Sequence, residues 1–253
     1  MRFAVISDLH SNIEALTAVF ADIDAKKIET VYCLGDVVGY GPDPEPCIDL
    51  VRERCAWCIR GNHDDALFGN PDRFNPYARG AINWTKDRIK PRRFFPSKLS
   101  TERWGWMQAM ITEKRIGEFY FVHGSPRDHV NEYIYQEDVF FNADGKLRAI
   151  FAVIDKALFV GHTHMPVIIS NSLKTFVPND KSNEFVLGDG KYIVNVGSVG
   201  QPRDRDIRSC WVEVDGQVVR YHRVSYEVNK VVQKIKSEPA LDPVLGTRLL
   251  EGA

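Results

Sequence analysis

Short apolar runs that end abruptly in a metal-capable side chain constrain the fold of this chain more than any other feature. Each run has three or four residues, and most are followed by glycine or serine before the polar side chain. They are residues 3–6 before Asp8, 31–34 before Asp36, 57–59 before Asn62 and His63, 119–122 before His123, and 158–160 before His162. Continuous apolar runs of this length are typical of strands buried on both faces of a sheet that lies between helices.

The segments between the first runs predict helices. Apolar residues at helical spacing follow Asn12, which can cap a helix over about residues 13–23, and residues 44–54 form a second candidate helix. The opening therefore predicts a β-α-β-α-β order, in which polar groups gather outside the carboxyl ends of the strands. Later runs at residues 167–169, 192–194, 210–214 and 218–222 predict a second sheet packed on the first, followed by a helix near 226–235 and a loose tail.

Residues 66–117 interrupt this rhythm, and we interpret them as a helical insertion beside the site, with helices near 77–89 and 101–111. The insertion is rich in aromatic residues: Phe68, Phe74, Tyr77, Trp84, Phe94, Phe95, Trp104 and Trp106. Most are expected to form the insertion's own core, and some to line a pocket that stacks a base or ring. With this insertion included, residues 1–253 are predicted to form one α/β domain.

Composition narrows the class of protein. The formal net charge of -1 gives no overall attraction to nucleic acid or anionic lipid. No apolar stretch approaches the length of a membrane span, and the first run is too short for a signal peptide, so a cytoplasmic location is expected. Five cysteines without an export signal argue against a disulfide framework. Cys55 and Cys58 have the spacing of a redox pair or half a zinc site, but with no second pair they are interpreted as structural.

Nitrogen and oxygen donors without thiolate follow the runs. Five of the seven histidines lie at or just after the run ends: His10, His63, His123, His162 and His164. Together with Asp8, Asp36 and Asn62, this donor set suits borderline transition metals better than Ca²⁺ or a structural zinc. Asp8 and His10 are two residues apart, as are His162 and His164, so each pair can face one metal cluster from an extended strand end. Each fragment alone is common, and the joint order predicts the site.

In this order the fragments resemble the calcineurin-like metallophosphoesterase family. The resemblance covers about residues 1–225 and rests on Ile-Ser-Asp-Leu-His at 6–10, Gly-Asp-Val-Val-Gly at 35–39, Gly-Asn-His-Asp at 61–64, His123, and Gly-His-Thr-His at 161–164. It implies an α/β fold, a four-layer α/β/β/α sandwich with two metals at the strand ends. It also implies that one metal is bound by Asp8, His10, Asp36 and His164, and the other by Asp36, Asn62, His123 and His162, with Asp36 bridging.

The resemblance also implies a mechanism. Two divalent metals that share a water lower its pKa, and the bridging hydroxide can attack phosphorus without a protein nucleophile. His63 has no metal role in this scheme, and its motif position implies that it stabilises the transition-state oxygens or protonates the leaving group. Asp64 and Asp43 are the candidates for orienting it. Mn²⁺ is the favoured metal, and Fe, Co²⁺, Ni²⁺ and Zn²⁺ accept the same donors.

The second motif departs from the family's protein phosphatases, because Gly39-Tyr40-Gly41 stands where they have Asp-Arg-Gly. The departure favours the bacterial-type branch of phosphodiesterases and dinucleoside-polyphosphate hydrolases, which Asn-Val-Gly-Ser-Val-Gly-Gln-Pro-Arg at 195–203 also resembles. There, glycines can allow close backbone approach. Arg203 and Arg127 are candidates for binding a phosphate oxygen, or are surface ion-pair residues.

The predicted function is hydrolysis of phosphate ester or anhydride bonds, on a small nucleotide-like phosphodiester. A phosphomonoesterase and a phosphoprotein phosphatase are the alternative enzymes. A metal-bound interaction scaffold without turnover is the alternative outside enzymes. Neither a membrane nor a nucleic-acid polymer is expected as a partner, since no basic run marks a groove for one. The sequence makes no prediction of oligomeric state.

Overall fold

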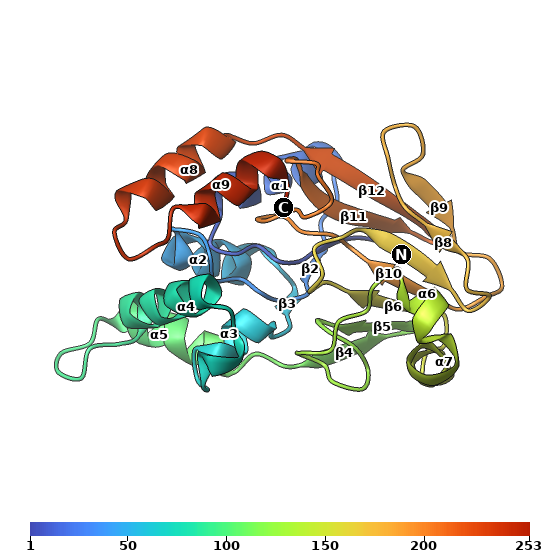
Figure 1. The fold of residues 1–253 in the computed structure, drawn as a ribbon, viewed down its shortest axis with the longest axis horizontal. Coiled ribbons are helices and arrows are strands. Elements are labelled where there is room, and N and C mark those ends of the chain that lie inside the picture. Colours follow the sequence, from blue (N-terminus) through green and yellow to red (C-terminus); the bar gives the residue numbers. More distant parts are fainter.

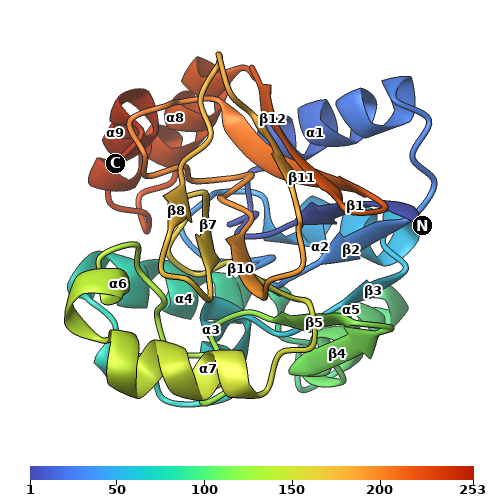
Figure 2. The ribbon, with the colours of Figure 1, turned by 90° about the vertical axis from the view of Figure 1, so that its right-hand side faces the viewer.

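Two six-stranded sheets lie face to face at the centre of the molecule (Figures 1 and 2). The computed structural model describes residues 1–253, apart from the side chain of Ala143. In order across the first sheet, the strands are β3 (Trp57–Cys58), β2 (Val31–Cys33), β1 (Arg2–Ile6), β11 (Ser209–Asp215), β12 (Val218–Val224) and β9 (Glu184–Val186). Across the second sheet they are β4 (Glu113–Ile116), β5 (Phe119–Val122), β6 (Ala157–Val160), β10 (Tyr192–Asn195), β7 (Val167–Ser170) and β8 (Thr175–Phe176).

Helices cover the outer face of each sheet. On the first sheet lie α1 (Ile13–Ala25) and α2 (Pro44–Arg54), and on the second lie α6 (Asp138–Phe141), the π-helical turn η2 (Ala143–Leu147) and α7 (Arg148–Ala152). Alternation along β1 explains the layering, because Ala4 and Ile6 pack toward α1 while Phe3 and Val5 pack against the second sheet. The four-layer α/β/β/α sandwich is confirmed. None of the described helices has the length and hydropathy that a membrane crossing requires.

Local sequence explains where α1 begins and which face it buries. The Asn12 side chain accepts a hydrogen bond from the Ala15 amide at 3.0 Å, which caps the helix as predicted. Leu16, Val19 and Phe20 recur at helical spacing and are buried against the first sheet. The predicted helix is therefore confirmed.

All nine predicted apolar runs form strands, but their expected division between the sheets is wrong. The structure places β5 and β6, which belong to the opening series, in the second sheet, and places β11 and β12 in the first. The cause is pairing over long distances in the chain: β1 pairs in parallel with β2 and antiparallel with β11, with Val5 opposite Val212. A run's own residues contain no information about which distant strand it will pair with.

The insertion is helical, but it ends earlier than predicted. The short helix α3 (Asn62–Ala66) leads into it, and it contains the 3₁₀ helix η1 (Pro71–Arg73), α4 (Pro76–Ile89) and α5 (Lys98–Gln108). Residues 113–116, expected within it, instead form β4 at the edge of the second sheet. Its Glu-Lys-Arg-Ile sequence is mostly exposed, which suits an edge strand and hides the strand from a search for apolar runs.

The expected loose tail is wrong, because a second helix packs on the first. α8 (Val228–Ser237) and α9 (Val244–Glu251) lie side by side, and α8 also contacts α1 (Figure 1). We call this pair of helices the C-terminal hairpin. Leu245 and Leu249, one helical turn apart, are buried in a cluster that includes Tyr40. Gly246 of α9 faces Val232 of α8, where even a Cβ would make ordinary van der Waals contact, 3.4 Å from the Val232 Cα.

Candidate metal centre

Turns at the carboxyl ends of strands from both sheets bring the predicted ligands together. Asp8 and His10 follow β1, Asp36 follows β2, Asn62 begins α3 after β3, His123 follows β5, and His162 and His164 follow β6. All seven side chains are buried, the most exposed being Asn62 at 8%. Residues more than 150 positions apart in the sequence thus share one site, as shown by the 3.1 Å between the Nε2 atoms of His10 and His164.

The turns hold their polar residues in a strained backbone conformation. The φ angle is positive at Asp8 (55°), His10 (49°), Asp36 (51°), His162 (68°) and His164 (63°), a region that costs such residues on the order of 1–3 kcal/mol each. Backbone hydrogen bonds between turns hold them in place, including Asp8 N to Gly35 O at 3.0 Å and His10 N to Asp36 O at 2.9 Å. Strain of this kind is concentrated at functional sites.

Two glycines let these turns approach one another. A Cβ on Gly61 would lie 2.1 Å from Asp36 Oδ1 and 2.3 Å from Asp36 N. A Cβ on Gly200 would lie 1.8 Å from the Leu9 carbonyl oxygen. The structure thus shows the close backbone approach that the sequence predicted for residues 195–203, and no larger residue fits at either position.

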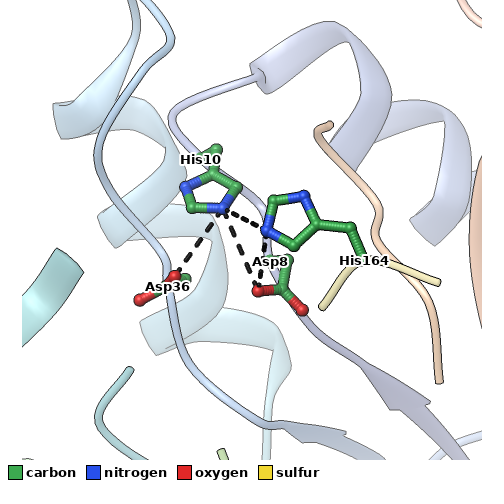
Figure 3. Close-up of side chains that lie close together, drawn as sticks. All are labelled: Asp8, His10, Asp36 and His164. Atoms are coloured by element: carbon green, nitrogen blue, oxygen red, sulfur yellow. Dashed lines mark hydrogen bonds and ion pairs between the residues drawn. The ribbon is translucent and has the colours of Figure 1, made fainter. Parts of the chain in front are cut away.

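The first group of candidate ligands comprises Asp8, His10, Asp36 and His164, whose donor atoms lie within 4.8 Å of one another. Figure 3 shows the side chains turned toward a common point. His10 Nε2 lies 3.7 Å from Asp36 Oδ2, and His164 Nε2 lies 3.3 Å from Asp8 Oδ1. This is the set that the family resemblance implies for one metal.

The second group comprises Asp36, His123 and His162, again within 4.8 Å. His123 Nε2 lies 3.5 Å from Asp36 Oδ2 and 3.2 Å from Asn62 Oδ1, so Asn62 joins the group. The same Asp36 oxygen is therefore close to a histidine of each group. That placement is the one a bridging carboxylate needs.

Hydrogen bonds outside the site fix which ring nitrogens face into it. The Nδ1 atoms of three histidines face main-chain carbonyls: His10 to Val38 (3.2 Å), His123 to Leu34 (2.9 Å) and His164 to Gln201 (2.6 Å). A carbonyl only accepts, so Nδ1 carries the hydrogen and a neutral ring directs its Nε2 lone pair inward. His162 Nε2 donates to the Asn131 carbonyl at 3.1 Å, which leaves its Nδ1 as the acceptor.

The centre is thus a buried convergence of aspartates and histidines that could hold metal ions. Burial lowers the pKa of His10 well below its ordinary value and that of His162 to about 3, so both rings are neutral at neutral pH. Burial opposes ionisation of Asp36, but His123 and His63 bring the pKa of its carboxyl well below the ordinary value. Burial likewise opposes a proton on His123, yet Asp36 and Asp8 raise its pKa to about 9. A proton on His123 and a divalent cation would each supply positive charge to these two carboxylates.

His63 lies against the centre without belonging to either group. Its backbone amide donates to Asp36 Oδ1 at 2.8 Å, and its ring packs on those of His10 (4.8 Å between centroids), Tyr40 (4.4 Å) and Phe74 (5.0 Å). Burial lowers its pKa to about 4. Its Nδ1 is buried and has no hydrogen-bond partner among the described side chains and backbone. Ring packing therefore holds this histidine.

Neither of the two aspartates considered from the sequence orients His63. The Asp64 carboxylate accepts from the Gly61 amide at 3.0 Å and the Val38 amide at 3.3 Å, which stabilises the turn instead. Asp43 pairs with Lys234 at 2.8 Å. Both carboxylates have structural partners, and the expectation that one of them holds the ring is wrong.

A cavity of about 650 Å³ opens beside the centre. Asn62, His63 and His162 reach it from the centre, and Tyr40, Arg203 and Arg248 line another part of its wall. Arg203 thus lies where the sequence suggested. Arg127 instead pairs with Glu132 at 3.2 Å and is 47% exposed, outside the described lining of the cavity. Arg248 was missed, although its position between Leu245 and Leu249 is the signal of a short amphipathic helix.

Aromatic side chains contribute less to the cavity than predicted. Of the insertion's aromatic residues that the structure describes, Phe74 alone lines it, while Phe68 and Trp104 pack together at 4.8 Å against the core that the insertion shares with the first sheet and its helices. Tyr133, which was not predicted, also lines the cavity. Its ring stacks on that of His162 at 3.7 Å and on that of Tyr135 at 5.3 Å between centroids. The stacking contact helps to hold the His162 ring in place.

Comparisons with known proteins agree with this geometry. The model of the calcineurin-like phosphoesterase superfamily domain matches residues 1–217. An uncharacterized protein of Methanocaldococcus jannaschii is 35% identical over 260 residues, which cover 98% of this chain and 97% of that protein. A metallophosphoesterase from Sphaerobacter thermophilus is 34% identical, with a TM-score of 0.82 and full coverage of both chains.

A more distant structure shares the fold. A hypothetical protein from Pyrococcus horikoshii OT3 is 19% identical, with a TM-score of 0.74 over 100% of this chain and 98% of that one. The family match, the relatives and the buried aspartate and histidine cluster lead to one conclusion. The chain belongs to the calcineurin-like phosphoesterase superfamily.

Proposed function

We propose that this phosphoesterase hydrolyses phosphate ester or anhydride bonds with two divalent metal ions. Asp8, His10, Asp36 and His164 would hold one, and Asp36, Asn62, His123 and His162 the other. A single observation carries the proposal: one oxygen, Asp36 Oδ2, lies 3.7 Å from His10 Nε2 and 3.5 Å from His123 Nε2, where the two ligand groups meet. Buried acceptors in this arrangement need shared positive charge.

Two divalent cations held by these residues would supply positive charge for an anionic phosphate and would make water a better nucleophile. The chain's own residues then set the geometry. Asn62 is a neutral donor, so it limits the negative charge that faces the substrate. His63 reaches the cavity wall beside Asn62, where it can donate to a phosphate oxygen or to the leaving group.

We further propose a small nucleotide-like phosphodiester as the substrate, with Mn²⁺ as the metal for assay. A cavity of about 650 Å³ is in the range of small-molecule sites. Gly39-Tyr40-Gly41, where protein phosphatases of the family have Asp-Arg-Gly, gives less support to a phosphoprotein substrate. The lining by Arg203 favours an anion.

A metal-by-substrate panel tests the function. Purified protein is loaded with each of Mn²⁺, Fe²⁺, Co²⁺, Ni²⁺ and Zn²⁺, and assayed on an aryl phosphodiester, an aryl phosphomonoester, a diadenosine polyphosphate, a cyclic nucleotide and a phosphopeptide. We expect the diesters and the polyphosphate to be the best substrates. Full activity after removal of metal by a chelator would end the proposal. Stoichiometric metal without hydrolysis of any phosphate compound would establish the scaffold instead.

A further inference from the structure

Two arginines in the cavity wall have no aspartate or glutamate among their described partners. Arg203 follows the turn after β10 and Arg248 lies on α9; both are half-buried. Among the described residues, neither forms an ion pair with an aspartate or glutamate, whereas the partly buried Arg103, Arg208 and Arg223 each pair with an aspartate. Partly buried guanidinium groups are normally paired, so this exception needs an explanation.

Hydrogen bonds satisfy these two arginines only in part. Arg203 Nη2 donates to Gln201 Oε1 at 2.7 Å and to the Tyr40 hydroxyl at 3.4 Å, while its Nε is buried without a partner among the described atoms. Arg248 donates from Nε to the main-chain oxygen of Ala253 at 3.0 Å, and its Nη groups have no hydrogen bond to the described residues. Donors therefore remain free on both side chains.

The two guanidinium groups are also close enough to repel one another. Burial, and next the charge of Arg203, lower the pKa of Arg248 below its ordinary value. Arg73 lines the cavity too, but it is exposed to solvent. Like charges held together in a partly buried wall favour a bound anion, which would receive charge-assisted hydrogen bonds from both.

The C-terminal hairpin holds this arrangement in place. Leu245 and Leu249, on either side of Arg248, are buried in the cluster that contains Tyr40. The end of α9 is tied to the segment after Arg203, because Arg205 N donates to Gly252 O at 2.9 Å. Arg248 is therefore prepositioned relative to Arg203, which reduces the entropy that binding would cost.

The two arginines have different surroundings. Arg203 contacts Tyr40, whose ring packs on His10 and His63 at the metal centre. Arg248 comes from α9, which supplies no residue of that centre and lies beyond the 217 residues that the family model matches. The centre serves the phosphate that is cleaved, so a second anionic group is needed to explain Arg248.

We infer that Arg203 and Arg248 form a second anion subsite, which binds a phosphate group of the substrate other than the one that is cleaved. The inference rests on the proposed phosphoesterase function and specifies its substrate class. The preferred substrates carry two or more phosphate groups in series, as dinucleoside polyphosphates and nucleoside di- and triphosphates do. Simple aryl diesters, with a single phosphate, leave the subsite unused.

Substrates with one and with several phosphates test the subsite. The probes are an aryl phosphodiester and diadenosine tetraphosphate, and the variants are Arg248→Gln and Arg248→Lys. The matched control is Lys236→Gln, which removes an exposed positive charge from the same hairpin outside the described lining of the cavity. Charged hydrogen bonds contribute enough that Arg248→Gln should lower kcat/KM for the tetraphosphate by about 10- to 100-fold, and for the diester by less than about 3-fold.

The conservative variant and a binding measurement keep the test decisive. Arg248→Lys keeps the charge but not the planar fork, so its kcat/KM for the tetraphosphate should lie between those of the wild type and Arg248→Gln. Calorimetry with inorganic tripolyphosphate and chelator-treated protein reads binding without turnover, and Arg248→Gln should bind about 10-fold more weakly, as a lost charged hydrogen bond predicts. Lys236→Gln should match the wild type in both assays.

Equal losses on both substrates, or equal tripolyphosphate binding by the wild type and Arg248→Gln, would overturn the subsite. Failure of the wild type to hydrolyse any phosphate compound with any metal would instead count against the proposed function. The calorimetric comparison still decides the subsite in that case, because it needs neither metal nor catalysis.

Discussion

Buried carboxylates occur in two regions of the molecule, and their neighbours differ in kind. On β11, Glu213 is 3% exposed and contacts Arg2 at 2.9 Å, Arg220 at 3.2 Å and His222 at 2.9 Å. At the strand ends, Asp8 and Asp36 are at least as buried, at 0% and 1%, but their side-chain neighbours are histidines. Most of those histidines are held neutral, with acceptor nitrogens directed inward.

The difference distinguishes a structural charge from a functional one. Glu213 is neutralised by other parts of the chain, so the sheet is complete without a ligand. Asp8 and Asp36 face histidines that are mostly neutral, so the chain compensates their charge less fully than that of Glu213. Burial alone does not identify a functional carboxylate. The charge and the hydrogen-bond donors of the neighbouring side chains do.

The largest effect should come from removing the oxygen shared by both ligand groups. Asp36→Asn should lose metal from both groups, because a neutral amide cannot bridge two cations, and turnover should fall by at least about 10³-fold. Elemental analysis of the dialysed protein and steady-state rates measure this. Asp87→Asn, an exposed change on α4, should leave both unchanged. If Asp36→Asn retained two metal ions per chain, the distinction between a functional Asp36 and a structural Glu213 would be wrong.

His63 tests whether the centre and its neighbour have separate roles. His63→Ala should keep the metal content of the wild type, since the side chain belongs to neither ligand group, but slow turnover by about 10²- to 10⁴-fold, as loss of a proton donor to the reacting oxygens does. Metal analysis and kcat are measured on the same preparation. An unchanged kcat would remove His63 from the mechanism, and loss of metal would make it part of the binding site.

Gly61 tests the steric basis of the centre. In Gly61→Ala the new methyl group would lie 2.1 Å from Asp36 Oδ1, so the carboxylate must shift, and metal affinity should fall by about 10- to 100-fold. The matched control is Gly80→Ala within α4, where a Cβ would meet nothing within 4 Å. That control should stabilise the fold by about 0.5–1 kcal/mol and raise Tm. Similar metal titrations for the two variants would contradict the close-packing argument.

The smallest effect on catalysis is expected at Glu213. Burial opposes its ionisation, but His222, Arg2 and Arg220 lower its pKa below the ordinary 4.5. A lowered folded-state pKa contributes stability above the unfolded-state value, and that stability is lost as pH falls through the folded-state pKa. Glu213→Gln should therefore destabilise the protein by about 1–3 kcal/mol at pH 7, and the deficit should shrink in acid.

Denaturant unfolding as a function of pH measures this deficit, and kcat and metal content should stay at wild-type values. A deficit that grew in acid would show that the sign of the linkage is wrong. A loss of metal in Glu213→Gln would mean that the two regions are coupled.

The sequence predicted the strands and the ligand positions because both are recorded locally. An apolar run that ends in Gly35-Asp36 predicts a strand followed by a candidate metal ligand, whichever strand it pairs with. Partnerships between distant segments were not predictable in this way, which is why β11 was assigned to the wrong sheet and β4 was missed. Arg127 and Arg203 illustrate the limit at one residue type: only the surroundings show that one pairs with Glu132 and the other lines the cavity.

The position of β1 between β2 and β11 has a consequence for how the protein matures. The first ligands leave the ribosome with β1, yet the strand that flanks β1 on its other side is made about 200 residues later, at Ser209–Asp215. The turn after β10 is late too, and there Ser198 Oγ donates to the Asp8 carbonyl at 2.8 Å. A nascent chain therefore lacks part of the frame of the centre until β11 has been made, so any metal that this centre binds would be held firmly only after nearly the whole chain is complete.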